Sequence, residues 1–143
     1  MPAYYRATLG DFVTHSGSEV LGHLAAAQGR EGHTTAFTAQ TVAWQEQVAA
    51  LQRMATELIS SRTNRSIWSV LIEYPIPRRQ KRIDALLLTA SRIYCMEFKT
   101  GDQAVSRAAL NQVEDYALDL RDFHAASLGC QIVPVLVVKQ AQA

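Results

Sequence analysis

Apolar residues recur at helical spacing in two long stretches of the chain. The stretch from about 41 to 60 has its apolar face at Trp44, Val48, Leu51, Ala55 and Leu58, and the stretch from about 106 to 124 has Leu110, Val113, Ala117 and Leu120. Because residues three and four apart lie on one face of an α-helix, both stretches predict amphipathic helices. A shorter helix is expected over about 18–28, with Ser16 or Ser18 as its N-cap and Gly29 at its end.

Four other stretches predict β-strands, because they are rich in β-branched and aromatic residues. They cover about 66–74, 83–88, 92–99 and 130–138. The last one is almost continuously apolar, so we expect a buried strand there. The order of elements is then helix, three strands, helix and strand, which predicts an α/β fold with a mixed four-stranded sheet flanked by helices. We divide the chain into an N-terminal arm with the short helix, 1–40, and a core, 41–143.

The composition of the 143 residues is that of a globular protein, with 48% apolar and 19% charged residues. Lys and Arg number 14 and Asp and Glu 13, which excludes a basic coat over the whole surface, of the kind that binds nucleic acid by charge alone. A local basic patch lies between the first two predicted strands, at Arg78, Arg79, Lys81 and Arg82. It is interpreted either as a solvated loop or as a set of contacts to phosphate groups.

The two cysteines, Cys95 and Cys130, stand in apolar stretches and are expected to be buried, reduced thiols. No apolar run reaches the roughly 18 residues that cross a bilayer. The N-terminus lacks the basic and apolar segments of a signal peptide. The four histidines show no paired metal-ligand spacing, so a zinc site is not expected. We therefore expect a cytoplasmic protein that has no membrane partner.

Three ionisable residues interrupt the second and third predicted strands: Asp84, Glu97 and Lys99. Side chains of a strand alternate between its faces, so Glu97 and Lys99 share a face, and a hairpin pairing would bring Asp84 beside Glu97. Two neighbouring carboxylates repel each other unless a cation resolves the conflict, and proteins bind Mg²⁺ through one or two carboxylates. A lysine close by can orient or help deprotonate a water molecule, which is an arrangement for hydrolysing a phosphodiester.

Each of these residues also has an ordinary structural explanation. Asp84 could pair with Arg82 or Lys81 in the hairpin. Glu97 and Lys99 could form an exposed pair on an edge strand. These explanations must hold by coincidence for all three residues, whereas a hydrolytic site explains them together.

Two glutamates outside these strands are weaker candidates. Glu73 precedes the hairpin, and it is interpreted as an auxiliary carboxylate or as a residue that faces solvent. Glu46 lies in the first long predicted helix, about 200° around the helix axis from Trp44, so we expect it on the solvent face.

The sequence Glu97-Phe98-Lys99, preceded by Asp84 at a distance that fits one hairpin, resembles the signature of the PD-(D/E)XK nuclease superfamily. The order of predicted elements also resembles the αβββαβ core of that superfamily, the restriction-endonuclease-like fold. The resemblance implies that Asp84 and Glu97 hold Mg²⁺ or Mn²⁺, together with the backbone carbonyl of Phe98, and that Lys99 orients the attacking water. Ile83 stands where the motif has its proline, a departure that this superfamily commonly shows.

Gln112 and Tyr116 resemble the Gln-x-x-x-Tyr pattern of the RecB-like members, where the pair is expected to position the DNA strand or the lysine. The opening 5–8, a helix with a tryptophan, and the segments 72–77 and 81–84 resemble the N-terminal nuclease domain of bacterial superfamily 1 nuclease–helicases. Some of those proteins act in anti-phage defence. The resemblance implies a magnesium-dependent deoxyribonuclease whose products carry 5′-phosphates.

The expected partner is DNA. A helicase or ATPase would be a domain or subunit outside this chain, which has no Gly-x-x-x-x-Gly-Lys-Ser/Thr motif. A homodimer is compatible with the sequence. Two other functions stay open: a catalytically inactive module with the nuclease fold that binds DNA or assembles with a partner, and an α/β domain with no role on nucleic acid.

Overall fold

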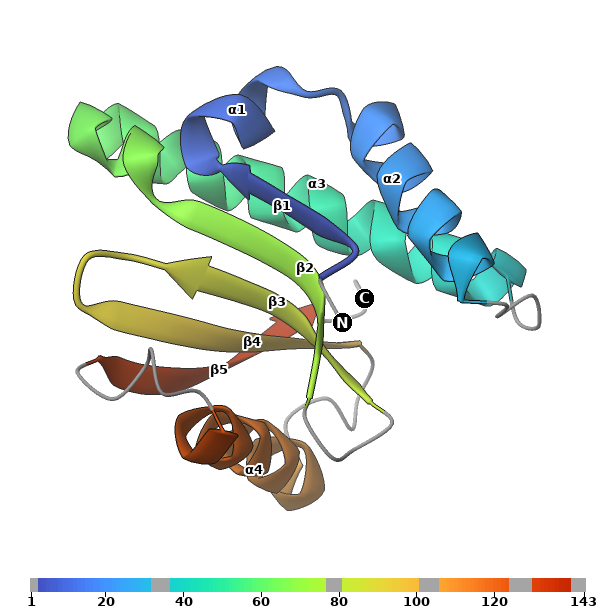
Figure 1. Ribbon diagram of the computed structural model, residues 1–143, viewed down its shortest axis with the longest axis vertical. Coiled ribbons are helices and arrows are strands. Elements are labelled where there is room, and N and C mark those ends of the chain that lie inside the picture. The colour runs from blue at the N-terminus through green and yellow to red at the C-terminus, as the bar shows by residue number, and fades with distance from the viewer. Residues whose placement is uncertain (1–2, 32–36, 77–80, 101–105, 124–129, 140–143) are drawn as a thin grey trace. The chain divides into compact units, whose positions relative to one another are not determined.

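The computed structural model describes residues 3–31, 37–76, 81–100, 106–123 and 130–139, within which five strands and four α-helices are observed (Figure 1). In chain order the elements are β1 (Tyr5–Thr8), α1 (Leu9–Thr14), α2 (Gly17–Arg30), α3 (Phe37–Ser61), a 3₁₀-helix η1 (Thr63–Ile67), β2 (Ser69–Pro75), β3 (Arg82–Leu88), β4 (Arg92–Thr100), α4 (Arg107–Phe123) and β5 (Gln131–Lys139). The strands form one mixed sheet in the order β1-β2-β3-β4-β5, with β3 antiparallel and β5 parallel to β4. The fold is α/β with helices flanking the sheet, as predicted, but the sheet has one strand more than the predicted four.

The additional strand is β1, which lies in the segment interpreted from sequence as an arm with one short helix. Its four residues are too few for an alternating pattern to stand out. α1 follows directly, and its N-cap Thr8 accepts a hydrogen bond from the Asp11 N–H at 3.2 Å. The first forty residues therefore contribute a strand and a second short helix that the sequence did not reveal.

The boundaries of the next two helices depart from the predicted ones by a few residues. α2 begins after Ser16, whose Oγ accepts a hydrogen bond from the Glu19 N–H at 3.1 Å, so Ser16 is the N-cap. The predicted end at Gly29 is wrong, because α2 continues to Arg30. A glycine costs a helix about 1 kcal/mol relative to alanine but does not by itself end it. α3 begins at Phe37, before the predicted start near residue 41.

The chain divides into two compact units, one from Tyr4 to Val70 and one that contains the chain from Leu71 onward. This division differs from the sequence-based division at residue 40. The first unit contains β1 and the helices α1, α2 and α3, and the second contains β3, β4, β5 and α4. All of the residues predicted to carry chemistry belong to the second unit.

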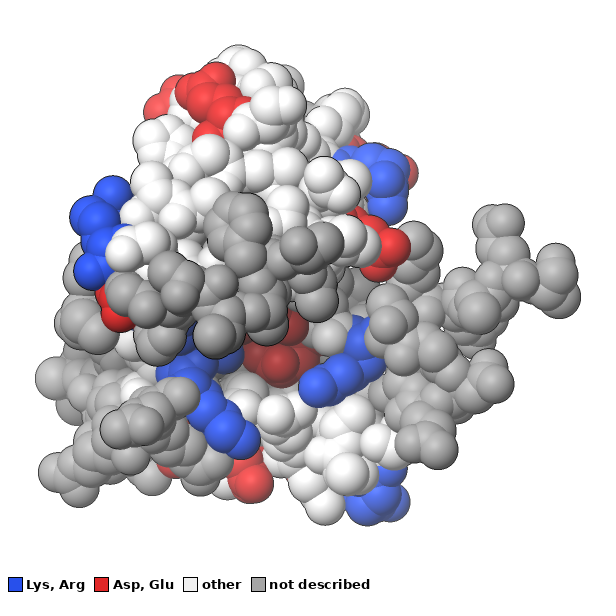
Figure 2. Space-filling view, turned by 90° about the vertical axis from the view of Figure 1, so that its right-hand side faces the viewer, with Lys and Arg blue, Asp and Glu red and all other residues white. Residues whose placement is uncertain are grey.

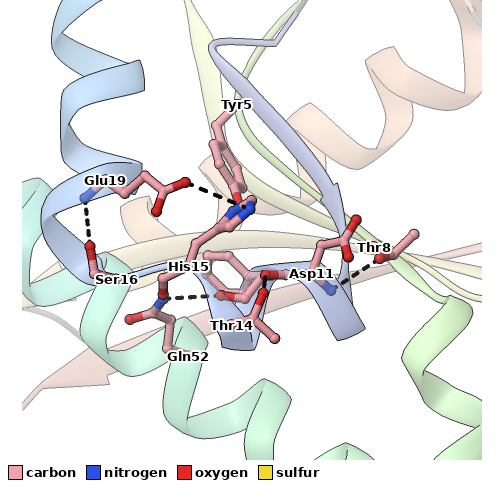
Figure 3. A network of polar contacts seen from close by, with 9 residues as sticks. Tyr5, Thr8, Asp11, Thr14, His15, Ser16, Glu19 and Gln52 are labelled. Atoms are coloured by element: carbon pink, nitrogen blue, oxygen red, sulfur yellow. Dashed lines mark hydrogen bonds and ion pairs between the residues drawn. The ribbon is translucent and has the colours of Figure 1, made fainter.

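A network of polar contacts ties the elements of the first unit together (Figure 3). The Tyr5 hydroxyl lies 2.6 Å from Nδ1 of His15, and Nε2 of Gln52 donates to the carbonyls of Phe12 and His15 at 3.2 and 2.9 Å. Burial raises the pKa of Tyr5 to about 12, and the nearby charge of Glu19 adds to this rise. The phenol therefore stays neutral and serves as a hydrogen-bonding group.

In the second unit, α4 packs on one face of the sheet, against β4 and β5 (Figure 1). A core cluster forms at this contact; it consists of Leu71, Ile76, Ile83, Leu86 and Cys95 from the segment of β2 to β4, and Val113, Tyr116, Ala117 and Leu120 from α4. The residues of α4 have the spacing that the sequence predicts for an amphipathic helix. This packing determines which face of α4 meets the polar residues of β4.

β5 does not have the burial that its sequence predicts. Its described side chains are half-buried or exposed, and Pro134 in its middle is exposed. The strand is the last one in the sheet order, a position where proline is tolerated because its missing N–H leaves no partner unsatisfied. Cys95 is buried as predicted, whereas Cys130, next to β5, is only half-buried.

Among the described residues, no helix combines the length and the apolar composition that a membrane span requires.

Candidate functional site

The antiparallel ladder between β3 and β4 ends where ionisable residues begin. Its last pair is Ala85 opposite Met96, so Asp84 and Glu97 occupy the next facing positions. Two bonds between backbone and side chain link the strands there. The Asp84 N–H donates to Oε1 of Glu97 at 3.0 Å, and the Phe98 N–H donates to Oδ2 of Asp84 at 2.8 Å. We call this part of the hairpin, Asp84 with Glu97–Lys99, the open end.

Burial and mutual proximity favour the protonated form of the two carboxyl groups. Glu97 is only 5% exposed, and Asp84 is half-buried. Burial, followed by the negative charge of Asp84, raises the pKa of Glu97 to about 8. Burial also raises the pKa of Asp84, although the Phe98 N–H offsets part of this rise. At neutral pH the pair therefore holds a proton, which a divalent cation could replace.

Lys99 lies on the same face of β4 as Glu97, because residues two apart share a face. Its positive charge lowers the pKa of Asp84 and of Glu97, so it offsets part of the effect of burial on each. Cys95 continues this face in the other direction, and burial followed by the two carboxylate charges raises the pKa of its thiol to about 12. The structure thus brings together Asp84, Glu97 and Lys99, as the predicted hairpin requires.

An open pocket of about 530 Å³ borders the open end, because Lys99 is one of its lining residues. The others include Lys81, Ser106, Gln112, Asp115 and Tyr116. Nε2 of Gln112 donates to the Tyr116 hydroxyl at 2.8 Å, while the Tyr116 ring is buried in the core cluster. Gln112 and Tyr116 therefore lie with Lys99 around a single pocket.

Ser106 is a pocket residue that the sequence-based search for functional groups missed. Its Oγ accepts a hydrogen bond from the Ala109 N–H at 3.0 Å, which is the contact of a helix N-cap. A serine directly before an apolar periodic stretch is a known signal for a helix start, so the sequence contained the information. Because Ser106 lines the pocket, the N-terminus of α4 borders it and adds partial positive charge to that of Lys81 and Lys99.

Charged side chains are unevenly distributed over the face of the molecule shown in Figure 2. Acidic residues lie recessed in a hollow, and Lys and Arg side chains lie beside it. The burial of individual residues follows the same pattern, since Glu97 is buried and Lys81 is exposed. Positive charge at an exposed rim favours the binding of an anionic group.

Glu73, the auxiliary candidate, lies in β2 with a half-buried side chain and a backbone φ of 58°. Its carbonyl accepts a hydrogen bond from Nη1 of Arg82 at 2.7 Å. Among the described residues, no group of three or more His, Cys, Asp or Glu side chains is gathered that could hold a metal ion. Within this part of the chain, Asp84 and Glu97 stand as a pair of carboxyl groups.

The four basic residues predicted to contact nucleic acid lie in different places. Lys81 lines the pocket, and Arg82 donates to the backbone of β2. Arg78 and Arg79 lie outside the described residues. Glu46 is exposed on α3, as its position on the predicted helix requires.

Comparison of the chain with protein-family models, with curated proteins and with solved structures gives no match in any of the three. The resemblance to the PD-(D/E)XK superfamily therefore depends on the short motifs and on the order of elements. What the residues of the open end can do is inferred from their geometry and their chemistry.

Proposed function

We propose that the chain is a metal-dependent nuclease domain that hydrolyses phosphodiester bonds in DNA. The observation that carries the proposal is the pair of facing carboxyl groups, Asp84 and Glu97, with the charge of Lys99 acting on both. Burying a carboxyl group is unfavourable, and burying two side by side is more so. This unfavourable arrangement is explained if a cation takes the place of the proton that the pair holds.

The donor set fits a hard divalent cation. Asp84 and Glu97 supply carboxylate oxygens, the ligands that Mg²⁺ and Mn²⁺ prefer, and the resemblance adds the carbonyl of Phe98. Mg²⁺ commonly keeps several water ligands, so two carboxylates are enough to hold it. When bound, the cation supplies Lewis-acid activation of the phosphodiester and neutralises part of its charge.

The residues around the pocket take roles that follow from their charge and position. Lys99 orients the attacking water and places positive charge where negative charge develops on the phosphate. Lys81 and the N-terminus of α4 bind DNA phosphates without reading the base sequence. Gln112 and Tyr116, held together by their hydrogen bond, position the DNA strand or the ammonium group of Lys99.

The reaction is a hydrolysis, and its only reactants are water and the phosphodiester. Water gives up a proton as its oxygen bonds to phosphorus, and the bond between phosphorus and the 3′-oxygen breaks. The 3′-oxygen takes up a proton and leaves as a hydroxyl group, while the other fragment retains the 5′-phosphate. Since the chemistry occurs on the phosphodiester alone, the proposed residues impose no base preference.

Cleavage of plasmid and linear DNA by the purified chain in the presence of Mg²⁺ tests the proposal. The wild type should cleave, and EDTA should stop it. The variants Asp84→Asn, Glu97→Gln and Lys99→Met should each lose at least about 100-fold in rate, because each removes a group that acts on the reacting atoms. Glu114→Gln is the matched control, since it neutralises an exposed carboxylate of α4, and it should cleave like the wild type.

Equal cleavage by the wild type and the three site variants would contradict the proposal. A chain that binds DNA but neither binds a divalent cation nor cleaves would instead be an inactive module with a DNA-binding or assembly role. Cation titrations of the wild type and of Glu97→Gln separate these outcomes, because only the nuclease requires the carboxylate for cation binding.

A further inference from the structure

Glu73 interrupts β2 with a backbone conformation that is unusual for its residue type. Its φ of 58° lies in the left-handed region, which is unfavourable for every residue with a side chain relative to glycine. β2 runs from Ser69 to Pro75, so Glu73 lies within the strand. A left-handed residue inside a strand interrupts the regular alternation of its side chains, as at a β-bulge, and we call this irregular point of β2 the bulge.

The packing of the strand shows the same irregularity. Leu71, Tyr74 and Ile76 all pack in the core cluster that contains the buried residues of α4. In a regular strand, residues on one face are separated by even numbers, but the step from Leu71 to Tyr74 is odd, and Glu73 lies inside it. β3 makes a similar odd step, because Ile83 and Leu86 both belong to this cluster, so the alternation is interrupted in both strands.

The bulge occurs level with the open end of the neighbouring hairpin. The Ile76 N–H donates to the Lys81 carbonyl at 3.0 Å. Three residues before Ile76 is Glu73 on β2, and three residues after Lys81 is Asp84 on β3, so counting from this bond places the two residues at the same level. Asp84 is also the first residue beyond the ladder between β3 and β4. The shift in β2 and β3 and the opening between β3 and β4 therefore fall at one level of the sheet.

Arg82 connects these features. Its Nη1 donates a charge-assisted hydrogen bond to the Glu73 carbonyl at 2.7 Å, and it precedes Asp84 by two residues on β3. We propose that Arg82 is a positioning residue: by holding the left-handed backbone of Glu73 it fixes the bulge, and with it the place of Asp84 at the open end. The inference rests on the proposed function for the role of Asp84, and it gives Arg82 a task other than contacting phosphate.

A double-mutant cycle on thermal stability tests whether Arg82 supports the backbone of Glu73. In the wild type and in a Glu73→Gln background, Arg82→Ala should lower the melting temperature by roughly 3–8 °C, because glutamine keeps the unfavourable conformation. In a Glu73→Gly background the same change should cost less than half as much, since glycine adopts a φ near 58° without support. Arg82→Lys keeps the charge and serves in the same cycle if Arg82→Ala does not fold.

A second measurement connects the bulge to the open end. Arg82→Ala should weaken Mn²⁺ binding by roughly 10-fold or more, the size of effect known for residues that support metal ligands, and adding Glu73→Gly should restore part of the affinity. Lys81→Ala is the control for a phosphate contact. It should keep the Mn²⁺ affinity and lower the salt slope of DNA binding by about 0.7–0.9, whereas Arg82→Ala should leave that slope unchanged.

Two results would overturn the role of Arg82. One is an equal loss of melting temperature in all three backgrounds, and the other is a lower salt slope with unchanged Mn²⁺ affinity, which is the behaviour of a phosphate contact. Failure of the proposed function looks different. A wild type that binds no Mn²⁺ and cleaves no DNA would remove the role of Asp84, while the melting temperatures would still show whether Arg82 holds the bulge.

Discussion

The two ends of the β3–β4 hairpin differ in what they contribute to the fold. At the closed end, Ala85–Leu88 pairs with Ile93–Met96 in a regular antiparallel ladder of mostly apolar residues. At the open end, two carboxyl groups face each other, and burial disfavours the charged form of both. The closed end stabilises the fold at any pH, whereas the open end is more stable when it holds a proton, which in our proposal a cation replaces. This combination is typical of a binding site placed at the edge of a rigid support.

The largest effect on stability is expected from truncating the closed end. Leu86 is 2% exposed and packs in the core cluster with α4. Leu86→Ala should lower the free energy of unfolding by about 2–5 kcal/mol, because it removes buried methyl groups and leaves a cavity. Urea unfolding measures this loss. Leu118→Ala, which changes a leucine of α4 that is 52% exposed, should stay within about 0.5 kcal/mol of the wild type. Equal losses for the two variants would contradict the packing described for the closed end.

A smaller effect is expected at the open end when the pH rises. The pKa of Glu97 is raised from its usual 4.5 to about 8 in the folded chain. The stability that comes from its protonated form is therefore complete below pH 4.5 and is lost as the pH rises through 8. Without metal, the free energy of unfolding should fall by roughly 2–3 kcal/mol between pH 6 and pH 9. Urea unfolding in EDTA at several pH values measures this change.

Glu97→Gln is the matched control for the pH dependence. Glutamine can accept the hydrogen bond from the Asp84 N–H but cannot ionise, so the loss between pH 6 and pH 9 should shrink to less than half. At pH 9 the variant should be more stable than the metal-free wild type. Saturating Mg²⁺ should stabilise the wild type and leave the variant unchanged. A wild-type free energy of unfolding that stays constant over this pH range would rule out the raised pKa.

The smallest effect is expected from the hydrogen bond beside the pocket. Tyr116→Phe and Gln112→Ala should each lower the free energy of unfolding by about 1 kcal/mol, because each removes the same bond. The double variant should lose clearly less than the sum of the two. Asn111→Ala changes a neighbouring exposed amide and is the control for Gln112→Ala. Full additivity would show that the two side chains act separately.

The open end could be predicted from the sequence because its geometry is local. Alternation along a strand places Glu97 and Lys99 on one face, and a short hairpin brings Asp84 beside Glu97, as the structure shows. In the same way, a spacing of four residues brings Gln112 and Tyr116 together on α4.

Features that depend on distant contacts could not be predicted. The left-handed backbone of Glu73 has no signal in the sequence, because glutamate has no preference for that conformation and is held there by Arg82. β1 is too short to show a pattern. The exposure of β5 follows from its place at the end of the sheet order, and an apolar run of residues does not distinguish a central strand from an edge strand.

Titration calorimetry with Mn²⁺ tests most directly the central claim that Asp84 and Glu97 bind a divalent cation. The full chain is titrated at pH 7 in two buffers that differ in their enthalpy of ionisation. We predict one binding event whose heat depends on the buffer, because the cation displaces the proton that the pair holds, and we predict its loss in Asp84→Asn and Glu97→Gln. No binding by the wild type, or the same heat in the wild type and both variants, would contradict the claim.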